Sequence, residues 1–87
     1  MARDNTPFAL ASAVILVQPE RLQAVAADIS ALPGAAIHAT SAQGKMVITL
    51  EDRSTEILVQ QFDLIRNLDG VLSADLIYQH SEESSDP

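Results

Sequence analysis

Apolar and polar residues along the chain form four segments with the pattern of β-strands. Residues 8–17 are apolar in both alternating sets and are bounded by polar residues, which is typical of a buried strand. Residues 35–41 alternate weakly and residues 45–51 alternate clearly, and a turn containing Gly44 joins them as a hairpin. Residues 71–79 are predicted to form the last strand.

Two further segments carry apolar residues at helical spacing. These residues are Leu22, Val25, Ala26, Ile29 and Leu32 in the first segment, and Leu58, Phe62, Ile65 and Leu68 in the second. Pro19 suits the first turn of the first helix, and either Asp52 or Ser54 can cap the second. Gly34 and Gly70 follow the last apolar positions and predict where the two helices stop.

The two halves of the chain repeat one pattern. Leu22, Ala26, Ile29, Leu32 and Gly34 are matched 36 positions later by Leu58, Phe62, Ile65, Leu68 and Gly70. Each half reads strand, helix, strand, which predicts the α+β, ferredoxin-like βαββαβ fold. Right-handed crossovers place both helices on one face of a four-stranded antiparallel sheet. We expect residues 8–79 to form this domain, after a flexible N-terminus (1–7) and before a disordered acidic tail (80–87).

The other face of the predicted sheet has no helix to cover it. Alternation directs Met46, Ile48, Leu50, Ile37, Ala39, Ala74, Leu76 and Tyr78 toward the helices, and Thr40 away from them. The uncovered face is expected to carry an apolar stripe of Val14, Leu16, Val47 and Ile77, with a rim of Ser12, His38, Thr49 and Asp75. Such a patch usually marks a protein or ligand interface. Two ordinary explanations remain open: β-branched residues favour strands, and a symmetric homodimer would use the same face.

Charge and composition exclude several classes of function. Twelve acidic and five basic residues give a net charge of −7, which argues against unaided nucleic-acid binding and suits a cationic partner. The chain has no cysteine, so it has no disulfide, thiolate nucleophile or cysteine metal site. Its two histidines fall on different segments, and no catalytic motif is present. We expect neither an enzyme nor a cofactor.

The longest apolar run is about half of what a membrane-spanning helix needs. It also lacks the order of an export signal, because its small residues lie within the run rather than after it. We therefore expect a cytoplasmic protein without membrane insertion.

Several segments, in their order and spacing, resemble the NapD family. They are Ser12 with the aliphatic strand after it, Glu20-Arg21-Leu22, Leu32-Pro33-Gly34, Arg66-Asn67-x-x-Gly70-Val71-Leu72, and Leu76-Ile77-Tyr78-Gln79-His80 with the acidic tail. The resemblance runs from about Phe8 to the end, and none of its motifs is catalytic. It implies a cytoplasmic chaperone that binds the twin-arginine signal peptide of the precursor of the periplasmic nitrate reductase catalytic subunit. Such binding delays export by the Tat translocase until the molybdenum cofactor is installed.

The resulting hypothesis is a peptide-binding chaperone, a monomer or a weak dimer, that uses the uncovered face. The stripe would contact the apolar part of the signal peptide, and Asp75 and Glu51 would meet its arginines. The alternative is a small-molecule-sensing module like the ACT and Lrp-type regulatory domains, which share this order of elements. Those domains often have a glycine-bearing loop after the first strand, where this chain has Gln18-Pro19-Glu20.

Overall fold

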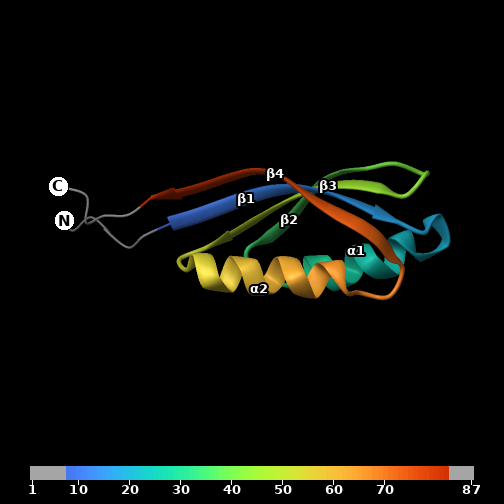
Figure 1. Cartoon of the computed structure of the whole chain (residues 1–87). Coiled ribbons are helices and arrows are strands. Elements are labelled where there is room, and N and C mark those ends of the chain that lie inside the picture. Colours follow the sequence, from blue (N-terminus) through green and yellow to red (C-terminus); the bar gives the residue numbers. More distant parts are fainter. Residues whose placement is uncertain (1–7, 83–87) are drawn as a thin grey trace.

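The computed structural model describes residues 8–82, with side chains described for residues 9–77. Its elements are β1 (Phe8–Val17), the 3-10 turn η1 (Pro19–Arg21), α1 (Leu22–Ser30), β2 (Ala35–Thr40), β3 (Lys45–Asp52), α2 (Thr55–Arg66) and β4 (Val71–Glu82). The strands form one antiparallel sheet in the order β2-β3-β1-β4. Both helices lie on the same face of this sheet (Figure 1). The predicted ferredoxin-like fold is confirmed.

The ends of the predicted domain fall close to the ends of the sheet. β4 continues to Glu82, three residues past Gln79, where the sequence pattern ended the strand. The N-terminus (1–7) and the remainder of the acidic tail (83–87) lie outside the described residues. Within the described part of the chain, no helix is long and apolar enough to cross a membrane.

The helix starts follow the predicted signals. Pro19 opens η1, which leads directly into α1. Ser54 is the N-cap of α2, and its Oγ accepts a hydrogen bond from the Ile57 N–H at 3.3 Å. Asp52, the other candidate cap, instead accepts from the Ser54 N–H at 3.4 Å through Oδ2. The two side chains thus organise the turn between β3 and α2 together.

The internal repeat of the sequence is also a repeat of backbone structure. After α1, the N–H of Ala35 donates to the Leu32 carbonyl at 3.2 Å. After α2, the N–H of Val71 donates to the Leu68 carbonyl at 3.1 Å. The glycine inside each turn has a positive φ, which is +81° at Gly34, a conformation that glycine adopts without a steric penalty. The chain therefore leaves both helices through the same kind of turn.

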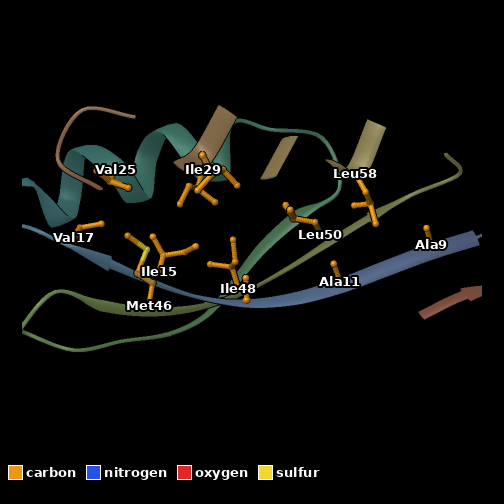
Figure 2. Packing of buried hydrophobic residues seen from close by; sticks show 12 residues of the cluster. Ala9, Ala11, Ile15, Val17, Val25, Ile29, Met46, Ile48, Leu50 and Leu58 are labelled. Atoms are coloured by element: carbon orange, nitrogen blue, oxygen red, sulfur yellow. The ribbon is translucent and has the colours of Figure 1, made fainter. Parts of the chain in front are cut away.

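The hydrophobic core lies between the helices and the sheet. Its buried residues are Ala9, Ala11, Ala13, Ile15, Val17, Val25, Ile29, Met46, Ile48, Leu50, Leu58 and Ile65. Every second residue of β1 belongs to this set, as expected for a strand with one face against helices. Figure 2 shows the side chains of Val25 and Ile29 directed from α1 toward the sheet. The predicted inward direction of Met46, Ile48 and Leu50 is confirmed.

A β-bulge in β2 corrects part of the predicted alternation. Ile37 pairs with Ile48, but the next pair joins Ala39 to Val47, so β2 has one extra residue at His38. Ala39 therefore shares the face of Val47, and the prediction that it points toward the helices is wrong. The prediction that Thr40 lies on the uncovered face is wrong for the same reason, because Thr40 pairs with the buried Met46.

Two more register shifts interrupt β4. The pairing passes from Leu76 opposite Ala13 to Tyr78 opposite Ser12, which leaves Ile77 as an extra residue. A second shift, after the pair of Leu16 and Ser73, leaves Leu72 unpaired. Simple alternation from Ser73 therefore fails at each bulge. Tyr78 was predicted to share the face of Leu76, but its backbone position pairs with Ser12 of the opposite face, so this prediction is wrong.

Candidate functional site

The sheet face opposite α1 and α2, here called the open face, is not covered by any helix within residues 8–82 (Figure 1). The backbone register arranges its positions in four rows that cross the strands. The rows are Lys45–Leu16–Ser73, Ala39–Val47–Val14–Asp75, Ala36–Thr49–Ser12–Tyr78 and Glu51–Leu10–His80. Neighbouring positions in a row lie about 5 Å apart, so each row acts as one strip of surface.

Aliphatic side chains occupy the middle of the open face. Val14 lies directly opposite Val47, and both are half-buried although no other layer covers them. Leu16 follows in the next row and is 40% exposed. Adjacent side chains on one pleated face shield each other, which explains the partial burial. The structure therefore brings three of the four predicted stripe residues together.

Ile77, the fourth predicted stripe residue, lies apart from the other three. It is the extra residue of the bulge in the edge strand β4 and is 58% exposed. The register gives it no partner and places it between the pair of Leu76 and Ala13 and the pair of Tyr78 and Ser12. It therefore does not continue the line of Val14, Val47 and Leu16.

The predicted polar residues Ser12, His38 and Thr49 lie close together. Ser12 pairs with Thr49 across β1 and β3. His38 Nε2 lies 2.8 Å from Thr49 Oγ1, a hydrogen bond in which either group can donate, depending on the imidazole tautomer. This contact holds the bulged residue of β2 against the open face.

The two predicted carboxylates are exposed but lie in different parts of the open face. Asp75 pairs with Val14 on the β4 edge, and Glu51 pairs with Leu10 on β3. They are about 13 Å apart along the strands and about 10 Å apart across them. Among the described residues neither makes an ion pair, whereas Asp69 pairs with Arg21 at 2.8 Å. Both carboxylates are thus available to a cation from outside.

The sequence analysis missed several residues of this surface. Leu10 shares the alternating set of Ser12 and was detectable by extending that alternation toward the N-terminus. Ala39 was not detectable, because nothing in the sequence marks the bulge before it. Lys45 shares the alternating set of Val47 and Thr49 and was detectable in the same way; it is the cation at the start of β3, opposite Leu16.

Within the described residues, the helix side of the sheet has a small hollow near β4. It has a volume of about 70 Å³ and is lined by Ala11, Leu58, Val59, Phe62 and Leu76. Its lining is apolar and contains no acid, base or nucleophile. In the described part of the chain, no three His, Asp or Glu side chains are grouped closely enough to hold a metal ion. The open face is therefore the more extensive candidate for binding.

Comparison with known proteins gives consistent matches. Residues 8–83 match the family described as NapD protein. Chaperone NapD of Escherichia coli (strain K12) is 28% identical over 83 residues, which cover 94% of this chain and 95% of that protein. Chaperone NapD of Paracoccus pantotrophus is 31% identical over 70 residues, which cover 80% of this chain and 62% of that protein.

A solved structure agrees with these sequence matches. The solution structure of the E. coli Tat proofreading chaperone protein NapD superposes with a TM-score of 0.79 and 27% identity, covering 97% of this chain and 88% of that chain. These matches do not favour the alternative of a small-molecule-sensing module. The sequence resemblance is confirmed, and the chain belongs to the NapD family of chaperones.

Proposed function

We propose that this chaperone binds the twin-arginine signal peptide of the precursor of the periplasmic nitrate reductase catalytic subunit on its open face. It does so in the cytoplasm, without catalysis, and delays export through the Tat translocase until the molybdenum cofactor is inserted. The name of the structural relative, a Tat proofreading chaperone, supports this kind of ligand. The single observation that carries the proposal is the uncovered aliphatic centre of a sheet whose other face is filled by two helices.

The apolar part of a signal peptide matches the centre of the open face. Val14, Val47 and Leu16 form a continuous surface that the chain's own helices do not cover. Burial of such a surface contributes about 25 cal/mol per Å² of apolar area removed from water. An amphipathic helix laid on the sheet would bury it in a helix-in-groove mode of recognition.

The arginines of the signal match the unpaired carboxylates of Asp75 and Glu51. Arginine binds carboxylates through two parallel hydrogen bonds, which orient the ligand as well as attract it. The rim of Ser12, Thr49 and His38 lies between the two acids and supplies further hydrogen-bonding groups. Apolar contact provides most of the affinity, and the acids select the arginine-bearing peptide.

The complex contains one chain and one peptide. A symmetric dimer through the open face would bury the same residues and would compete with the peptide. The free protein is expected to be a monomer or a weak dimer, and a weak dimer should dissociate when peptide is added. Sedimentation of the protein with and without peptide measures this change.

The first test introduces a charge at the centre of the open face. Val47→Asp places a carboxylate beneath the apolar segment of the peptide, and we expect binding at least about tenfold weaker because that carboxylate loses its water. Calorimetric titration with a synthetic twin-arginine signal peptide measures the change. Val47→Thr keeps the shape but replaces one methyl group with a hydroxyl, and a smaller loss of affinity is expected.

Val59→Asp is the matched control, because it makes the same substitution on the exposed surface of α2, away from the open face. It changes the net charge equally and should leave the affinity unchanged. Amide spectra of each variant establish that the fold is intact. Equal affinities for the wild-type protein and Val47→Asp would remove the open face from the proposal.

A further inference from the structure

The two ends of the open face carry opposite charges, and the proposed function does not depend on this difference. Lys45 and Glu51 are opposite charges at the two ends of β3, six residues and about 20 Å apart. Both are exposed, and neither makes an ion pair within the described chain. At about 0.1 M salt the Debye length is about 10 Å, so a ligand charge at one end barely senses the charge at the other.

Resting on the proposed function, we propose that the signal peptide binds in one direction, with its arginines at the Glu51 end of β3 and the far end of its apolar segment at Lys45. Glu51 attracts the arginines at one end. Lys45 repels them from the other, so the reversed direction loses an attraction and gains a repulsion. Lys45 is therefore a specificity-determining residue for the direction of the peptide.

The distribution of apolar side chains on the two central strands favours the same direction. The half of the face next to Glu51 holds Ser12 and Thr49, with Leu10 as its one aliphatic residue. The half next to Lys45 holds the aliphatic cluster described above. A twin-arginine signal has its arginines first and its apolar stretch after them, so its polar part matches the first half and its apolar part the second.

The length of the face and the dipole of the peptide agree with this placement. A span of about 20 Å corresponds to about 13 residues of α-helix. A helix running from Glu51 toward Lys45 places the partial negative charge of its C-terminus beside the lysine ammonium group. Attraction at both ends thus favours the same direction.

Two other charges near the face partly oppose this direction without cancelling it. Asp75, on the edge strand β4, lies in the row of Val14, two residues from the row of Lys45 and four from that of Glu51, so its attraction for arginine partly offsets that of Glu51. Arg53 follows the last residue of β3 and is not part of the sheet register. Its charge lies near Glu51 in the sequence, at the other end of β3 from Lys45. A substitution of Arg53 therefore controls for a change of charge that is not made at the Lys45 end.

The test uses two synthetic twin-arginine signal peptides, each with one nitroxide label, placed either just before the arginines or just after the apolar segment. Each is bound to the isotopically labelled full chain, and broadened amide signals report which part of the protein lies near the label. We expect the first label to broaden the amides of Leu10, Glu51 and Asp52. The second is expected to broaden those of Leu16, Lys45 and Ser73.

A charge exchange provides the second arm. Lys45→Glu combined with Glu51→Lys leaves the net charge unchanged, and we expect the two broadening patterns to exchange or to become mixed. Arg53→Glu changes the charge as much as Lys45→Glu does but lies at the other end of β3, and it should keep the original direction.

The outcomes separate the two proposals. Two results in the wild-type protein overturn the proposed direction: each label broadens the end opposite to the one expected, or each label broadens both ends. Either result leaves the proposed function standing, because the peptide still binds the open face. A peptide that shifts no open-face amides removes both. Both proposals are supported if the wild-type protein gives the expected broadening pattern and the charge exchange abolishes or inverts it.

Discussion

Val47 and Ile48 are adjacent in the chain, but their side chains have different surroundings. Ile48 is fully buried under the helices, whereas Val47 lies half-buried on the open face. The period of two along a strand thus assigns one residue to the core and its neighbour to the open face that we propose for binding. The same separation holds between Ile15 in the core and Leu16 on the surface.

This separation predicts different costs for substitutions at neighbouring positions. Ile48→Ala leaves a cavity in the core and is expected to lower the free energy of unfolding by about 2–5 kcal/mol. Val47→Thr, on the open face, is expected to change it by less than about 1 kcal/mol, because threonine also favours strands. Urea denaturation of both variants measures the two values. Similar losses at the two positions would contradict the assignment of the faces.

At the scale of elements, the turns after α1 and α2 connect each helix to the strand that follows it. A Cβ at Gly34 would collide with the backbone carbonyl oxygen of Glu51. The N–H of Glu51 donates to the Gly34 carbonyl at 2.9 Å, which joins the turn after α1 to β3. A Cβ at Gly70 would instead lie 2.7 Å from the Cβ of Arg21, an atom whose position the backbone of η1 fixes. Both positions of the repeat therefore exclude a side chain, and the overlap is closer at Gly34.

We accordingly expect unequal effects of the same substitution in the two turns. Gly70→Ala should lower the free energy of unfolding by at least about 1–2 kcal/mol, the cost of a positive φ for a residue with a side chain, to which the overlap with Arg21 adds. Gly34→Ala should cost more, above about 2 kcal/mol, because its overlap with a backbone carbonyl oxygen is closer. Thermal and urea unfolding of the two variants provide the comparison, and equal costs would show that the carbonyl of Glu51 adapts.

Element order, helix ends and core faces were predictable because their signals are local and regular. Met46, Ile48 and Leu50 alternate without interruption, and Ser54 and Gly34 mark a helix start and a helix end. The bulge at His38 was not predictable, because no glycine or proline marks it and the extra residue is visible only in the pairing with β3. The error at Ala39 and Thr40 follows from this one residue.

The prediction of the candidate surface was limited in the same way, by bulges and by the order of the strands. Val14, Val47 and Leu16 were placed correctly, because β1 and β3 pair without a shift between them. The position of Ile77 depends on a bulge in β4, and the distance between Asp75 and Glu51 depends on the order of the strands. Sequence alternation assigns a residue to a face but does not place it within that face.

At the scale of the whole molecule, the excess of acidic residues creates a field that extends beyond the open face. The net charge is −7, and Arg21 and Arg66 are each 2.8 Å from an aspartate oxygen, which offsets their charge. A cationic ligand is therefore attracted before it makes contact. This attraction increases the rate of association more than it increases affinity.

We therefore expect salt to act mainly on association with a twin-arginine peptide. Raising the ionic strength from about 0.05 M to about 0.5 M should lower the association rate constant about tenfold, with a smaller change in dissociation. Stopped-flow fluorescence with a labelled peptide measures both rates. A peptide with glutamine in place of both arginines should show a weak dependence, and equal salt dependence of the two peptides would contradict this explanation.

The interruptions of β4 have a consequence for solubility. An outermost strand of 12 residues is long enough to recruit extended chains and to seed fibrils. The unpaired residues Leu72 and Ile77 break the even spacing of its backbone groups, so an incoming strand cannot add along its whole length. The irregular edge thereby hinders edge-to-edge aggregation of a molecule whose open face leaves aliphatic side chains exposed to solvent.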